Sequence, residues 1–245
     1  WSSDVCSSDL VNNGLGGIIQ RGQVKSIQLD EGRLAIPDFD HPRLELAMGL
    51  HGASENMLDV LKNSPLFDSP KDLDGIQISG AAKLDLDMNI NLDSRDPVPD
   101  RVEGWYRPQK VHLQTFGLNF TQLAGDLHFI NLDFDSQNLS ARLKEQPAQI
   151  SISSHLSSAP PLEDRGYHIE VNTETQLGDW FHPVPSPLAE PGGHFPVHAR
   201  LILSPDPLNT PTMRLDLKSE LVGLDINLPA PLGKMAATKR PTQAQ

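Results

Sequence analysis

Two histidines have the spacing of a metal-binding pair. His194 and His198 lie four residues apart, and on a helix that spacing would place both imidazoles on one face. Pro196 lies between them and Gly192-Gly193 comes just before, and these residues are incompatible with a helix. We therefore expect a solvated loop at this point and no metal ion.

A run of acidic and amide side chains has the spacing that opens a calcium loop. On an extended strand, however, side chains on the same face lie about 7 Å apart, too far to surround one ion. The glycine that turns an EF-hand loop is also missing. We expect a solvated strand face instead, formed by Asp85, Asp87, Asn89, Asn91 and Asp93.

Residues for covalent catalysis are not arranged in a recognisable site. No G-x-S-x-G motif occurs, and the many serines lie in polar turn sequences, so a Ser-His-Asp hydrolase is not expected. Four aromatic residues flanking expected loops could form a sugar platform, but packing or edge positions are the commoner role of such residues. They are Trp105, Tyr106, Trp180 and Phe181. We expect a protein that is not an enzyme and needs no cofactor.

The chain has 245 residues, with 32 acidic and 20 basic side chains. Its first ten residues, WSSDVCSSDL, read back codon by codon as a common short-read sequencing adapter, so we interpret residues 1–10 as an adapter artefact. Without Asp4 and Asp9 the acidic count falls from 32 to 30 and the net charge from −12 to −10. Without Cys6 no cysteine remains.

This composition excludes several classes. An acidic chain without a Lys/Arg cluster lacks the cations that bind a phosphate backbone, so nucleic acid is not an expected partner. A chain without cysteine has no disulfide framework, zinc ribbon or thiol nucleophile. No apolar stretch reaches the roughly 18 residues of a membrane-spanning helix.

The elements that must position any site are mainly strands, because the apolar residues recur with a period of two. In residues 76–92 the even positions are apolar apart from Gly80, and the odd positions are mostly polar. This pattern predicts a strand of about 55 Å with one apolar face, unless a bend near Gly80 interrupts it. Shorter alternating runs occur at 24–36, 44–50, 111–113, 127–129, 139–143, 150–156 and 213–228.

Turn and helix signals separate these runs. We expect a turn at Glu31-Gly32 and a β-bulge at Gly223, where the apolar parity switches. A helix is expected from Ser54 to Asn63, with Ser54 as N-cap, and it should cover one end or edge of the sheet. Proline-rich loops are expected near 96–100, at 160–161 and near 182–196, and a linker or truncated end at 234–245.

Three segments carry a resemblance to a known family. LVGLDINLPAPLGK at 221–234, SENMLDVLKNSPLF at 54–67, and LNFTQLAGDLHF at 118–129 followed by LSARL at 139–143 resemble the central region of the YhdP-like branch of the AsmA-like envelope proteins. The resemblance implies a fragment of a longer periplasmic protein of diderm bacteria, anchored in the inner membrane by a segment outside this sequence. It further implies phospholipid transport between the inner and outer membranes, with phospholipid acyl chains as the bound partner.

The fold class that we expect is all-β with one or two short helices, in which residues 11–233 form a long, twisted, mostly antiparallel sheet curled into an elongated open groove. Its lipid-lining residues would be Ile76, Ile78, Leu84, Leu86, Met88, Ile90, Leu92, Leu127, Phe129, Leu215 and Leu217. Two alternatives stay open. One is a structural β-sandwich or surface adhesion module with a closed core, and the other is a polysaccharide-processing β-solenoid with clustered carboxylates in a cleft.

Overall fold

The structure is a computed structural model that describes residues 2–11, 13–63, 75–93, 100–115, 117–154, 166–179, 193–204, 212–229 and 231–244. The chain divides into two compact units, Trp1–Phe134 and Asp135–Gln245. Each unit is described by itself below.

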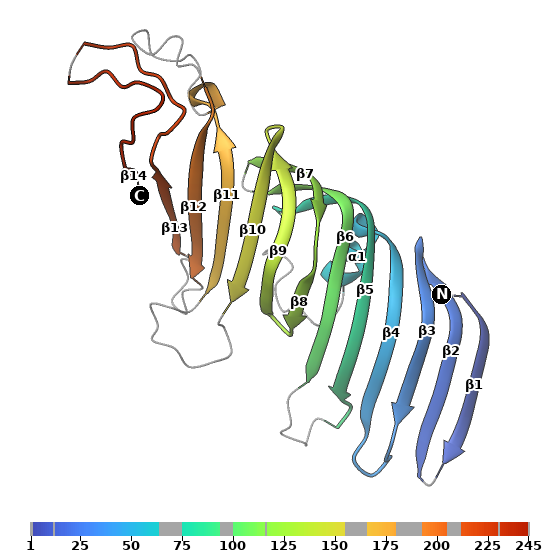
Figure 1. The fold of residues 1–245 in the computed structure, drawn as a ribbon. Coiled ribbons are helices and arrows are strands. Elements are labelled where there is room, and N and C mark those ends of the chain that lie inside the picture. The colour runs from blue at the N-terminus through green and yellow to red at the C-terminus, as the bar shows by residue number, and fades with distance from the viewer. Residues whose placement is uncertain are drawn as a thin grey trace. The chain divides into compact units, whose positions relative to one another are not determined.

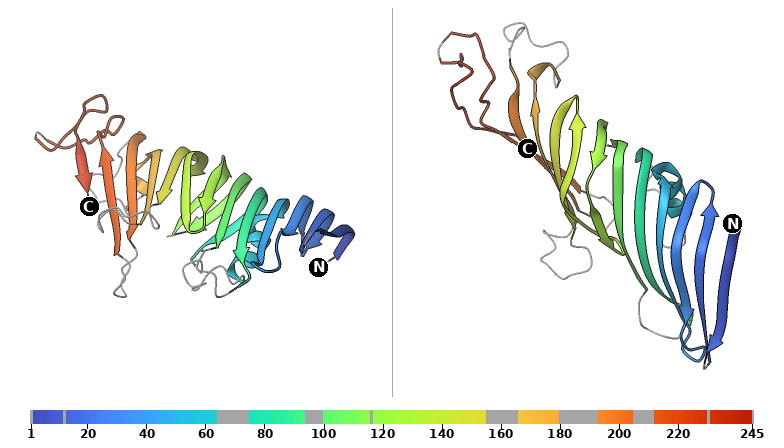
Figure 2. Two further views of the ribbon diagram at one scale, coloured as in Figure 1. Left: turned by 90° about the horizontal axis from the view of Figure 1, so that it is seen from below. Right: turned by 45° about the vertical axis from the view of Figure 1, so that its right-hand side comes forward.

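Unit 1 is an antiparallel meander of eight strands, in which strands adjacent in sequence pair with one another from β1 to β7 (Figure 1). The strands are β1 Ser2–Val11, β2 Gly14–Val24, β3 Ile27–Ile36, β4 Arg43–Ala53, β5 Gln77–Asn91, β6 Arg101–Thr115, β7 Leu118–Ala124 and β8 Leu127–Ile130. The short strand β8 pairs with β6 beyond the end of β7. Figure 2 shows β1 to β6 side by side in chain order.

Unit 2 repeats this arrangement with fewer strands, again paired antiparallel in chain order. They are β9 Asp133–Leu143, β10 Gln146–Ser154, β11 Tyr167–Thr175, β12 Phe195–Ser204, β13 Thr212–Ser219 and β14 Thr242–Ala244, with a 3-10 turn at Leu177–Asp179. The predicted all-β, antiparallel fold is confirmed.

The long strand predicted at 76–92 is confirmed as β5, which has 15 residues, and its partner β6 is equally long. A register shift lies at Gly80, where the backbone has a φ of 118° and β6 places Lys110 at a φ of 59°. Residues with a side chain rarely adopt the positive φ of Gly80, and a Cβ there would make a tight contact of 3.2 Å with the Cα of Val111, so glycine suits this position. Because the extra residue is on β6, the even positions of β5 stay on one face across the shift.

The predicted turn at Glu31-Gly32 is wrong. The pair Glu31-Gly32 is not a turn: β3 runs through it with a register shift between Leu29 and Gly32, and the chain reverses at Lys25, which has a φ of 55°. An acidic residue followed by glycine suits a β-bulge as well as a turn, so composition did not separate the two.

The expected bulge at Gly223 is likewise absent. Strand β13 ends at Ser219, and Gly223 lies in a turn with a φ of 98°. A Cβ at Gly223 would lie 2.0 Å from the carbonyl oxygen of His194, which explains the glycine. The change of parity therefore marks the end of a strand.

The predicted helix is confirmed as α1, Ser54–Lys62, but its N-cap is Ala53 and no side chain caps it. Ser54 is the first helical residue and only 2% exposed, and its Oγ accepts a hydrogen bond of 2.8 Å from the hydroxyl of Tyr106. A contact with a distant strand, which no local pattern reveals, therefore uses the serine hydroxyl that would have capped the helix.

The loop predictions fall mainly outside the described residues, which do not include 94–99, 155–165 or 180–192. The loop expected around His194 and His198 is wrong for Pro196 and His198, which lie in β12, because proline is accepted near the start of a strand. In the segment after β13, Lys234 is 5% exposed and donates hydrogen bonds to the carbonyl oxygens of Leu224 at 2.9 Å and Met235 at 3.0 Å. None of the helices in the described part of the chain is long and apolar enough to cross a membrane.

Candidate functional site

Unit 1 carries a continuous apolar face on strands β4, β5 and β6. Residues paired directly across antiparallel strands project from the same face, and the register aligns Leu46 with Met88 and Met48 with Leu86. The members of this apolar face are Leu44, Leu46, Met48 and Leu50 of β4, Leu84, Leu86, Met88 and Ile90 of β5, and Val102, Gly104 and Tyr106 of β6. The β4 and β5 members are all half-buried.

The opposite face of unit 1 is polar and is held by charge pairs. Arg107 forms an ion pair with Asp85 and lies 3.2 Å from Asp126, and the hydrogen bond from Arg107 to Asp85 is the main reason that the pKa of Arg107 is raised. Glu103 accepts a hydrogen bond of 2.7 Å from Arg101 and contacts His128 at 3.0 Å. These two contacts, with Arg101 first, lower the pKa of Glu103.

This polar face carries a hollow at Ala47 of β4. The hollow has a volume of about 560 Å³, and its lining includes Ala47 with Asp87 on one side and Arg33 on the other. Trp105 also lines the hollow, and its ring stacks on His128 with ring centroids 4.4 Å apart. The acidic and basic side chains of this polar face suit contact with water, whereas the apolar face on the other side of the same strands suits contact with hydrocarbon.

Unit 2 has the same division into faces. One cross-strand row joins Ile152, Ile169, Leu201 and Leu215, and the next joins Ile150, Val171, Ala199 and Leu217. Near the end of this face, Met213 is 63% exposed and Leu215 is 42% exposed. Unit 2 therefore presents an apolar surface that its described residues leave partly open.

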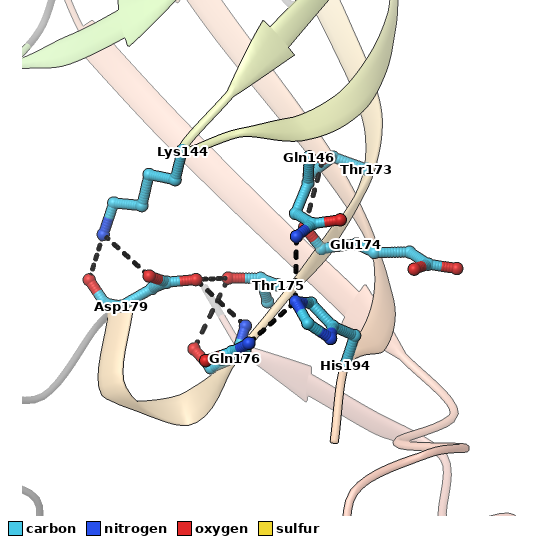
Figure 3. Close-up of polar contacts among 8 residues, drawn as sticks. All are labelled: Lys144, Gln146, Thr173, Glu174, Thr175, Gln176, Asp179 and His194. Atoms are coloured by element: carbon cyan, nitrogen blue, oxygen red, sulfur yellow. Dashed lines mark hydrogen bonds and ion pairs between the residues drawn. The ribbon is translucent and has the colours of Figure 1, made fainter. Parts of the chain in front are cut away.

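A polar cluster lies where β10, β11 and β12 begin or end (Figure 3). The Nε2 atom of His194 lies 2.8 Å from the side-chain amide of Gln146 and 2.7 Å from that of Gln176. The hydroxyl of Thr175 donates to Asp179 at 3.0 Å, and Lys144 donates to the backbone carbonyl of Asp179. The polar groups of this cluster are therefore hydrogen-bonded to one another within the protein.

The two histidines of the candidate metal pair do not meet at a common point. His194 contacts two glutamine amides, whereas Nδ1 of His198 lies 2.8 Å from the side chain of Asn172 on β11. Within the described ranges, no three His, Cys, Asp or Glu side chains gather closely enough to hold a metal ion. Asp85 and Asp87 lie on an extended strand, as expected, and both are exposed.

The predicted lipid-lining residues divide between the two units. Four of them, Leu84, Leu86, Met88 and Ile90, are contiguous on the apolar face. Leu127 and Phe129 lie in β8, directly across from Tyr106 and Gly104 of that face. At the ends of β5, Ile76 just precedes the strand and Leu92 follows it and is 50% exposed, while Ile78 pairs with Leu113 of β6. Leu215 and Leu217 belong to unit 2. Contact of these residues with lipid stays a prediction.

Sequence reasoning missed the β4 half of the apolar face. The alternation of Leu44, Leu46, Met48 and Leu50 was visible, but only the pairing of β4 with β5 shows that these residues lie beside the predicted set. Trp105 and Tyr106 were expected to flank a loop, yet both lie inside β6. Tyr106 belongs to the apolar face and Trp105 to the polar one.

Fold and faces together define a class of protein: antiparallel sheets with a polar face and an apolar face that the described part of the chain covers only in part. The chain belongs to the YhdP family, because residues 7–245 match the family described as YhdP protein. One relative, named Intermembrane phospholipid transporter YhdP, from Escherichia coli (strain K12), is 22% identical over 244 residues. The match covers 93% of this chain and 18% of the relative, and no solved structure matches.

Proposed function

We propose that the apolar faces of this chain hold phospholipid acyl chains and form part of a route between the inner and outer membranes, in the periplasm of a diderm bacterium. One observation carries the proposal: a continuous row of leucine, methionine and isoleucine side chains on β4 and β5 is only half-buried. The name of the relative, an intermembrane phospholipid transporter, indicates what such a surface would meet.

The physical case rests on what acyl chains contribute. Each methylene group that leaves water contributes about 0.8 kcal/mol, and this gain has no directional requirement. A lining of aliphatic side chains therefore accepts acyl chains of different length and lets them slide. No nucleophile, acid or metal is needed for such transfer.

A structural sandwich or adhesion module is the competing function. A sandwich buries its apolar face against a second sheet about 10 Å away. In each unit the described strands instead pair edge to edge, in chain order except for β8, and among the described residues of unit 1 the helix that packs on the apolar face is α1. This arrangement favours a lipid surface over a closed core.

Adjacent residues of β5 provide a matched pair of variants to test the proposal. In the full-length protein that contains this sequence, Leu86→Lys places a charge on the apolar face, which costs several kcal/mol if water stays out. Asp87→Lys makes the same side chain on the polar face. We expect Leu86→Lys to reduce delivery of isotope-labelled phospholipid to the outer membrane at least fivefold, and Asp87→Lys to change it less than twofold.

Melting curves of both variants serve as the control for folding. Equal delivery by two folded variants would contradict the proposed lipid surface in unit 1.

A further inference from the structure

Helix α1 covers one end of the apolar face of unit 1, where Leu50, Leu84 and Tyr106 pack against the cluster under the helix. Met57 of α1 packs on Ile27 and Ala82, which are only 5% and 2% exposed. Further along β5, Leu86 and Met88 belong to the same face and are half-buried, and in the described part of the chain no helix lies above them. Figure 1 shows α1 against β4 and β5 near one end of these strands.

Polar contacts hold α1 in this position on several strands. Lys25, in the turn between β2 and β3, forms an ion pair with Asp59, and the adjacent Ser26 accepts a hydrogen bond from Asn56. On the other side of the helix, Glu55 accepts a hydrogen bond of 3.3 Å from the backbone amide of Gly80. The Tyr106 hydroxyl donates to Ser54 at 2.8 Å.

These contacts matter because α1 has nine residues, too few for a helix to be stable in water by itself. Its place on the sheet therefore depends on Met57 and on the polar contacts at both sides. Since they reach the β2–β3 turn, β5 and β6, the helix is fixed across the width of several strands.

We infer that α1 is a fixed wall that keeps acyl chains on the strip of the apolar face between Leu86 and Ile90, because Leu84 packs against the cluster under the helix. The inference rests on the proposed function and adds a boundary to it. Four residue steps along β5 give the strip a length of about 13 Å in the strand direction.

Three methionines test the inferred wall directly. Met48 and Met88 lie on the open strip, whereas the Met57 side chain lies between α1 and the sheet. Replacing methionine by diazirine-bearing photo-methionine in the full-length protein changes side-chain size very little. After irradiation in membranes that contain phospholipid, we expect lipid adducts at Met48 and Met88. At Met57 we expect at least tenfold fewer lipid adducts, with crosslinks to protein instead.

The outcomes separate the two proposals. Lipid adducts at Met57 as frequent as at Met88 would contradict the inference that α1 is a wall, without contradicting the proposed lipid surface. Lipid adducts at none of the three methionines would contradict the lipid surface itself.

A disulfide lock tests whether the wall is fixed. Ser26→Cys combined with Asn56→Cys, in a background without other cysteines, would join α1 to the β2–β3 turn where the two side chains already touch. We expect phospholipid delivery by the oxidised and reduced forms to agree within twofold, with each single cysteine variant as control. If oxidation abolished phospholipid delivery and reduction restored it, α1 would have to move during transport. That result would contradict the inference that α1 is a fixed wall.

Discussion

Adjacent residues of β5 meet opposite surroundings. Leu86 lies between Met48 and Gly104 on the apolar face, whereas Asp85, one position earlier, pairs with Arg107 on the polar face. Strand geometry alone produces this contrast, since successive side chains project from opposite faces. The chemistry of the surface is therefore encoded one residue at a time, and single substitutions can test it.

Gly104 provides a prediction about packing between β6 and β8. A Cβ at this position would lie 2.6 Å from the ring of Phe129 and 2.6 Å from the carbonyl oxygen of Asp85. We expect Gly104→Ala to lower the free energy of unfolding by about 1–3 kcal/mol, the usual cost of overpacking. Gly16→Ala is the matched control, because a Cβ there meets no atom within 4 Å.

Urea unfolding measures both glycine variants. The control should change stability by about 0.5 kcal/mol or less. Equal effects of the two substitutions would show that Phe129 does not pack against Gly104.

Tyr106 provides a prediction about pH. Burial raises the pKa of its phenol, an effect that the hydrogen bond to Ser54 partly offsets. Because the pKa in the folded state lies above the unfolded value of about 10, the associated stability is fully present below pH 10 and is lost as pH rises through the folded value. Tyr106→Phe should abolish this alkaline loss and cost about 1 kcal/mol at neutral pH, through the missing hydrogen bond.

Urea unfolding of parent and Tyr106→Phe at pH 8, 10 and 11 measures that difference. Parallel losses of stability in the two proteins would place the titrating group elsewhere.

At the scale of elements, the sequence predicted those strands whose signal is local. The alternation at 76–92 and the apolar stripe of α1 both come from side-chain periodicity, and both elements are present. The turn at Glu31-Gly32 and the bulge at Gly223 failed because glycine marks bulges, turns and strand ends alike. The β4 half of the apolar face and the contact between Ser54 and Tyr106 depend on pairing between distant residues, which periodicity does not report.

Strand β1 carries a prediction about the first ten residues, which we interpret as translated adapter. The structure pairs Ser2–Val11 with β2, and the family match begins at residue 7. Strand β2 keeps β3 on its other side, so we expect a chain that begins at Val11 to match the longer chain in stability within about 0.5 kcal/mol. Thermal unfolding of both chains measures this difference, and a clear loss of cooperative unfolding would show that the ten residues belong to the protein.

At the scale of the whole molecule, both units follow one plan. Each is an antiparallel meander in which cross-strand rows of aliphatic side chains lie on one face and charged side chains on the other. Exposed Met213 and Leu215 in unit 2 correspond in character to the half-buried strip in unit 1. The central claim is that these apolar faces hold acyl chains. It predicts that along a strand lipid contacts occur only at the alternate residues that point to the apolar face.

Site-specific photo-crosslinking tests that claim most directly. A photoreactive side chain would replace Leu86, Met88, Asp85 or Asp87, one at a time, in the full-length protein, and captured phospholipid would be detected after irradiation. The account predicts capture at Leu86 and Met88 and none above background at Asp85 and Asp87. Equal capture at both parities, or capture at neither, would contradict it.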